Sequence, residues 1–97
     1  MTTRGYPNSY DDVFSAILQA IADCGFQKES VDKPSGQIVA STGVSLRSWG
    51  ERIEIQVSKL DNRTNVSISS SPEAQLIDWR KSRENIDMLF AAIERHL

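Results

Sequence analysis

The sequence of 97 residues contains only one cysteine and one histidine, Cys24 and His96. A single cysteine excludes an intrachain disulfide and agrees with the reducing cytoplasm, where we expect the protein to act. We expect Cys24 to pack as a small hydrophobe near the end of a helix. One histidine and one cysteine cannot supply a zinc site rich in nitrogen and sulfur ligands. His96 is penultimate, where a terminal helical turn frays, and this position does not suit catalysis.

Long apolar runs and an excess of one charge are also absent. No run approaches the roughly 20 apolar residues of a membrane-spanning helix, and the N-terminus lacks the apolar segment of a signal peptide. The net charge is −2, and the five glycines are dispersed. A chain of this charge lacks the many cations that bind nucleic-acid phosphates, and dispersed glycines form no phosphate loop. We therefore expect no nucleic-acid binding, no membrane span, no metal and no cofactor.

What the sequence does contain is an alternation of apolar residues with period two between residues 38 and 70. This period is typical of half-buried strands, because successive side chains leave opposite faces. The alternation predicts a strand over residues 37–47 and two further strands after it. The three sets of apolar positions are Ile38, Ala40, Thr42, Val44 and Leu46; Ile53, Ile55 and Val57; and Val66, Ile68 and Ser70.

A weaker pattern precedes these strands. Residues 26–31 are interpreted as an edge strand, which enters a hairpin through the turn residues 32–36 because proline and glycine favour turns there. Gly43 marks a bulge or a bend within the long strand.

The phase of each run limits the register, because facing residues of an antiparallel pair point to the same side of the sheet. For one hairpin we predict Val44 opposite Ile55, with residues 49–50 as a two-residue connection. For the next hairpin we predict Ile55 opposite Ile68, across the polar loop 60–63. The further pairs that these registers require are Leu46 with Ile53, Thr42 with Val57, and Val57 with Val66.

Apolar residues at intervals of three and four predict a helix before the strands, over residues 10–24. Ser9 is the expected N-cap, three residues before Asp12, and Gly25 is the expected left-handed stop. We expect residues 1–8 to form a flexible N-terminal arm.

A second helical stripe, from Ile86 to Leu97, follows the strands. Its start is open between capping by Asp78 and capping by Ser82. Residues 74–77 are then an extended connection or a short fifth strand.

Together these elements predict one α+β domain over residues 1–97, in the order α-β-β-β-β-α. A sheet with one apolar face and two helices with one apolar stripe each pack as two layers. We therefore expect an antiparallel meander sheet with both helices on one face.

The start of the last helix carries a cluster of cations beside an aromatic residue. The helix dipole disfavours each cation there by about 0.3 to 1 kcal/mol, so an anionic ligand or an acidic partner would compensate. The alternative is solvated surface charge, paired with Glu84 or Asp78. Trp49 and Arg47 join this site if the hairpin tip folds toward it. The members of the cluster are Trp79, Arg80, Lys81 and Arg83.

The second face of the expected sheet is polar and of mixed charge. It offers no aromatic platform for stacking bases, so RNA binding through the sheet is not expected. Val39 and Val31 are candidate apolar anchors for a protein partner. The polar residues expected on this face are Ser41, Ser45, Arg47, Arg52, Glu54, Gln56, Asn65, Ser67 and Ser69.

The second half of the chain carries Ser-Trp-Gly-Glu at residues 48–51, three serines at residues 69–71, and then Asp78 and Asn85. This succession resembles a pattern of small bacterial α+β families, which are domains of unknown function. Those families have a serine-rich strand, then an aspartate, then an asparagine at the start of a terminal helix. The resemblance implies the same fold, with Asp78 and Asn85 as structural or functional residues, most simply as caps of the last helix.

No catalytic pair stands out in the sequence. We therefore expect a non-catalytic interaction module, not an enzyme, that contacts another protein or a second copy through a strand edge or the polar face. The alternative is a domain that binds the anion of a phosphorylated metabolite or a lipid headgroup through the basic cluster. An enzyme is the third hypothesis and requires a pocket with converging ionisable groups.

Overall fold

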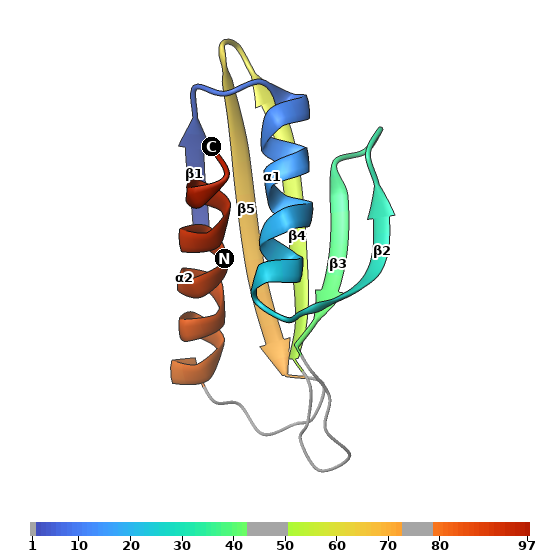
Figure 1. Ribbon diagram of the computed structural model, residues 1–97, viewed down its shortest axis with the longest axis vertical. Coiled ribbons are helices and arrows are strands. Elements are labelled where there is room, and N and C mark those ends of the chain that lie inside the picture. Colours follow the sequence, from blue (N-terminus) through green and yellow to red (C-terminus); the bar gives the residue numbers. More distant parts are fainter. Residues whose placement is uncertain (1, 43–50, 73–78) are drawn as a thin grey trace.

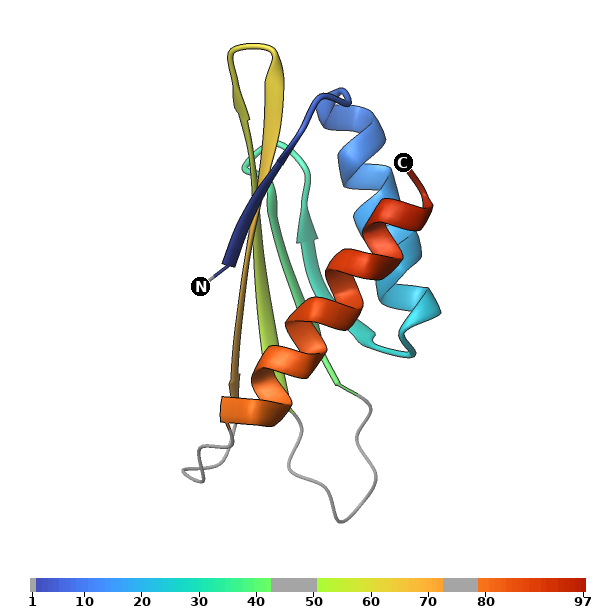
Figure 2. The same cartoon turned by 90° about the vertical axis from the view of Figure 1, so that its left-hand side faces the viewer.

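A computed structural model describes residues 2–42, 51–72 and 79–97 of the chain. The described residues form five strands and two helices in one two-layer arrangement, and both helices lie on the same side of the sheet (Figure 2). The elements are β1 (Thr2–Tyr6), α1 (Tyr10–Asp23), β2 (Gln27–Asp32), β3 (Gln37–Ser41), β4 (Glu51–Leu60), β5 (Arg63–Pro72) and α2 (Trp79–Arg95). The predicted α+β class and the two layers are confirmed.

The sheet is antiparallel and has the strand order β1-β5-β4-β3-β2. Strands β2 to β5 form the predicted meander, and β2 is an edge strand as expected (Figure 1). The opposite edge is β1, whose Arg4 lies opposite Val66 of β5. The prediction of a flexible arm over residues 1–8 is therefore wrong, because Thr2–Tyr6 form a strand of the sheet.

Helix α1 begins and ends where the sequence predicts, within one residue. The Ser9 side chain accepts a hydrogen bond from the backbone N–H of Asp12 at 3.1 Å, which satisfies one of the free donors of the first turn. At the other end Gly25 has φ of 73°, the left-handed conformation that stops a helix.

The predicted register of the β4–β5 hairpin is confirmed, with Ile55 opposite Ile68 and Asp61 in its turn at φ of 56°. The predicted register of the β3–β4 hairpin is wrong, because Ile55 lies opposite Ile38 and not opposite Val44. Both registers place apolar residues on the same face, so the alternation could not distinguish them. The pairing requires a longer connection than the predicted Trp49-Gly50. Two further predicted pairs are wrong for the same reason. They are Leu46 with Ile53 and Thr42 with Val57; in the structure Ile53 lies opposite Ala40.

Three further sequence predictions concern the ends of elements. Helix α2 already begins at Trp79, so capping of its start by Ser82 is wrong. The alternative cap Asp78 and the candidate strand at 74–77 lie outside the described residues, as does the bulge expected at Gly43. The described sheet has its irregularity in β2 instead, between Lys28 and Ser30.

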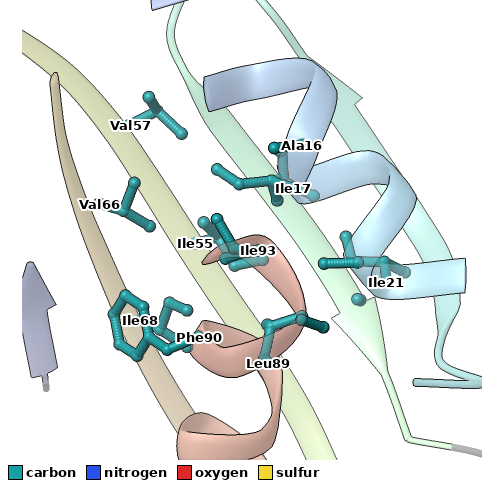
Figure 3. Packing of buried hydrophobic residues seen from close by; sticks show 14 of the residues in the cluster. Ala16, Ile17, Ile21, Ile55, Val57, Val66, Ile68, Leu89, Phe90 and Ile93 are labelled. Atoms are coloured by element: carbon teal, nitrogen blue, oxygen red, sulfur yellow. The ribbon is translucent and has the colours of Figure 1, made fainter. Parts of the chain in front are cut away.

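The hydrophobic core lies between the sheet and the two helices. Figure 3 shows side chains from both layers of the molecule in this core, among them Ile55 of β4, Ile17 of α1 and Ile93 of α2. All three side chains are at most 1% exposed. Helix α1 packs on the central strand β4, and α2 packs on the neighbouring strand β5 and on α1. Each helix is too short or too polar to cross a membrane, as far as the chain is described.

Side chains as well as backbone pairing attach β1 to the rest of the molecule. Arg4 donates a hydrogen bond to the carboxylate of Glu94 at 2.7 Å, and the Tyr6 hydroxyl donates to the same oxygen at 2.8 Å. The Arg4 guanidinium also lies over the ring of Phe90, at 4.6 Å from its centroid. These contacts join the first strand to α2, the last helix.

Candidate functional site

The face of the sheet that the helices leave uncovered is polar. Along β4, Arg52, Glu54 and Gln56 alternate with the buried Ile53 and Ile55 and therefore point away from the helices. The other described residues of the predicted polar set belong to the same face by pairing, and these are Ser41, Asn65, Ser67 and Ser69. Ser45 and Arg47 of that set lie outside the described residues. We refer to this surface as the open face.

Part of the open face, near β2, is hollowed into a pocket of about 460 Å³. This volume falls within the range of about 300 to 1,000 Å³ that is usual for ligand pockets. The lining combines a carboxylate, a guanidinium, an amide and two hydroxyls with small apolar groups. The lining residues are Glu29, Ser30, Gln37, Val39, Ala40, Ser41 and Arg52.

A β-bulge places Glu29 in this pocket. Lys28 pairs with Ala40 and Ser30 pairs with Val39, so Glu29 is the extra residue between two successive pairs. A bulge bends its strand and redirects a side chain. Here it brings Glu29 within reach of β3, where the Ser41 hydroxyl donates a hydrogen bond to its carboxylate at 2.7 Å.

The Ser41 residue whose hydroxyl donates to Glu29 is buried. Ser41 is only 5% exposed, although it lies on the open face. A buried hydroxyl requires a hydrogen-bond partner, and the carboxylate supplies it. Glu29 is thus fixed at one oxygen by a charge-assisted hydrogen bond.

The guanidinium of the pocket already has an anionic partner. Arg52 Nε lies 3.2 Å from Glu54 Oε1, and both side chains are about half exposed. Glu54 also lines a second, smaller hollow of about 270 Å³ on the open face, which shares Gln37 with the first. Arg52 is thus paired with Glu54, and no described residue of the lining forms an ion pair with Glu29.

The pocket lies beside the free edge of β2. All six residues of this strand are exposed, and Val31 shows 44% of its surface to solvent. Val31 lies opposite the buried Ile38, on the helix side of the sheet, so the expectation that it shares the open face with Val39 is wrong. An edge strand presents unpaired backbone N–H and C=O groups to solvent. A partner at this edge would therefore meet the backbone of β2 and the side chains of the pocket together.

The structure describes only part of the basic cluster expected from the sequence. Arg47, Trp49 and Asp78 lie outside the described residues. Trp79, Arg80, Lys81 and Ser82 belong to the first turn of α2, but their side chains are not among those described. Arg83 is exposed on α2, and Asn85 is half-buried and engaged in an interaction. Of this cluster and its neighbours, the two residues whose side chains are described, Arg83 and Asn85, do not line the pocket.

The pocket uses residues that the sequence analysis did not single out, namely Glu29, Ser30 and Gln37. The one available signal was the weak alternation of residues 26–31. A bulge interrupts the period of two, so the alternation is lost at the residues that form the pocket.

The single cysteine and the single histidine both pack between or near the helices. Burial raises the pKa of the Cys24 thiol, which keeps it protonated and poorly nucleophilic. The thiol contacts the hydrophobic core, as the sequence predicts. The His96 ring lies 2.5 Å from the carboxylate of Asp23 and joins the end of α2 to the end of α1. Within residues 2–42, 51–72 and 79–97, no three His, Cys, Asp or Glu side chains are grouped to hold a metal ion.

Comparison with known proteins finds no matching family model and no matching curated protein.

Proposed function

We propose that the protein is a non-catalytic interaction module that binds a protein partner along the free edge of β2 and the adjoining open face. The observation that carries this proposal is the combination of a fully exposed edge strand with a pocket directly beside it. Addition of a strand to such an edge is a general mode of peptide recognition. The partner is another protein or a second copy of this chain.

The composition of β2 supports selective rather than indiscriminate pairing. Lys28, Glu29 and Asp32 place charges along the edge, and the bulge interrupts its regular backbone. Proteins use charges and bulges to prevent edge-to-edge aggregation. We therefore expect this edge to pair only with a strand that complements its charges and its bulge.

Two finer expectations from the sequence accompany this proposal. One is action in the cytoplasm, which the single cysteine supports. The other is kinship with the small bacterial domains that residues 48–86 resemble. The anion-binding alternative depends on Arg80, Lys81 and Arg83 beside Trp79, and of these side chains the structure describes only that of Arg83, which is exposed.

Substitution of Val31 by lysine tests the proposal. Val31 is 44% exposed at the β2 edge, so Val31→Lys adds a charge to the edge without disturbing the core. We expect this variant to weaken capture of a partner, or self-association, by about tenfold or more. Affinity capture from a cell lysate measures binding of a partner, and sedimentation over a wide concentration range measures self-association.

Leu60→Lys is the matched control, because Leu60 is 61% exposed at the far end of β4. It should bind as the unsubstituted protein does. Equal binding by both variants, or a monomer that captures no partner, would contradict the proposal.

A further inference from the structure

We propose that the pocket beside β2 binds one basic side chain, a lysine or an arginine, of an extended partner segment that adds to β2 as a further strand. This inference rests on the proposed function and deepens it, because it names the chemistry that the partner must present. Three features of the described residues support it, namely the direction of Glu29, the charge of the pocket and the apolar floor.

The bulge gives the pocket its position relative to an added strand. Glu29 and Ser30 together oppose Val39, so the side chains at this point of β2 are crowded toward the open face. A strand that pairs with the free edge of β2 places alternate side chains on that same face. Directly opposed side chains of neighbouring strands lie about 4.5 to 5.5 Å apart at Cβ. A long side chain at this register therefore reaches the Glu29 carboxylate.

The charge of the pocket selects the kind of side chain. Ser41 holds one oxygen of Glu29 at 2.7 Å, and Arg52 is engaged by Glu54. No described residue forms an ion pair with Glu29, so its negative charge is available to a partner. A lysine ammonium or an arginine guanidinium satisfies this carboxylate by a charge-assisted hydrogen bond. A neutral or acidic side chain would leave the charge uncompensated or would be repelled.

The floor of the pocket suits the rest of such a side chain. The side chain of Val39 lines it and is only 8% exposed, whereas the Ala40 side chain points to the core opposite Ile53. Lysine and arginine carry an apolar stem behind the charged group, and the stem packs on apolar surface while the charge remains hydrated. The pocket thus offers an apolar contact followed by a carboxylate.

Three peptides with blocked termini test the inference. Each has the sequence Thr-Val-X-Val-Thr, with lysine, glutamine or glutamate at X. We would titrate each peptide into the isotope-labelled protein and follow the backbone amide signals. We expect the lysine peptide to shift signals of β2 and β3 and to bind at least about fivefold more tightly than the glutamine peptide. The glutamate peptide should bind most weakly.

Glu29→Gln should remove the preference for the lysine peptide while the amide spectrum shows an intact fold. Glu84→Gln is the matched control, because Glu84 is exposed on α2, on the other side of the sheet. It makes the same change of charge and should keep the preference.

The outcomes separate this inference from the proposed function. Equal binding of the lysine and glutamine peptides at β2 would overturn the inference that the pocket binds a basic side chain, and would leave the proposal of strand addition in place. If no peptide binds, but Val31→Lys still abolishes capture that Leu60→Lys retains, the inference fails and the proposed function stands. If Val31→Lys also has no effect on capture, both fail.

Discussion

Gly36 occupies a position in the β2–β3 turn where the surrounding backbone leaves no room for a side chain. It has φ of 76°, and an added Cβ would lie 2.1 Å from the carbonyl oxygen of Val57. The Gly36 carbonyl also accepts a hydrogen bond from the Val57 N–H at 2.8 Å. The turn is therefore fixed against β4 by direct backbone contact.

We predict that Gly36→Ala destabilises the protein by about 3 kcal/mol or more, because the methyl group displaces β4 from the turn. Gly25→Ala is the matched control. Gly25 has a similar φ of 73°, but nothing lies within 4 Å of an added Cβ. This variant should lose only about 1 kcal/mol, the cost of the left-handed conformation. Denaturant unfolding measures both, and equal losses would show that the contact with Val57 does not matter.

At this scale the sequence predicted the turn but not the reason for its glycine. Pro34 and Gly36 are local turn residues, and their chemistry can be seen in the sequence. The contact with Val57 is a tertiary one across 21 positions of the chain, and no local pattern encodes it.

At the scale of elements, β1 depends on one carboxylate of α2. Hydrogen bonds from Tyr6 and then from Arg4 lower the pKa of Glu94 below its ordinary value. Burial, and then the hydrogen bond to Glu94, raise the pKa of Tyr6. The ionised form of Glu94 and the neutral form of Tyr6 are thus the forms that the folded protein favours.

The lowered pKa of Glu94 sets the direction of a pH effect on stability. A carboxyl group with a lower pKa in the folded state stabilises the fold above its unfolded pKa, and this contribution is lost as the pH falls through the folded pKa. We predict that Glu94→Gln costs about 1 kcal/mol at pH 7, since the side chains are more than 40% exposed and solvent screens the pair. The difference from the unsubstituted protein should disappear at strongly acidic pH.

Urea unfolding between pH 2.5 and 8 measures this difference. Glu84→Gln, also on α2, should show no such pH-dependent loss. A cost of Glu94→Gln that stays constant down to pH 2.5 would contradict the assignment of the effect to the Glu94 charge.

The hairpins show which part of the element arrangement a sequence can predict. Alternation assigned Ile38, Ile53 and Ile55 to one face, and the structure confirms that face. It could not choose between Ile38 and Val44 as the neighbour of Ile55, because shifts of even length keep every side chain on its face. The choice depends on tertiary packing and on a connection of greater length than a tight turn.

The edges of the sheet were harder to predict for a related reason. The positions of β1 that face the helices are Thr2, Arg4 and Tyr6, which do not form an apolar alternation. Arg4 and Tyr6 instead donate hydrogen bonds to Glu94, about 90 positions away in the sequence. Likewise the candidate site depends on a bulge at Glu29, which removes the pattern that would mark a strand. Both edges are therefore defined by tertiary contacts.

At the scale of the whole molecule, β1 closes one edge of the sheet. It pairs with residues 64–68 of β5. Its removal would expose the backbone edge of β5, a strand whose Val66 and Ile68 side chains are buried in the core. Exposed edges of this kind favour association between copies.

We predict that a variant lacking residues 2–6 is destabilised by about 2 kcal/mol or more, because it loses the pairing with β5 and the hydrogen bonds to Glu94. It should also self-associate at concentrations where the full chain does not. Addition of a peptide of residues 1–8 should reverse both effects, since the peptide can refill the edge. Thermal unfolding and sedimentation with and without the peptide measure the two. Unchanged stability after the deletion would contradict this prediction. It would mean that residues 2–6 act as an arm despite their pairing, and that β1 does not close its edge of the sheet.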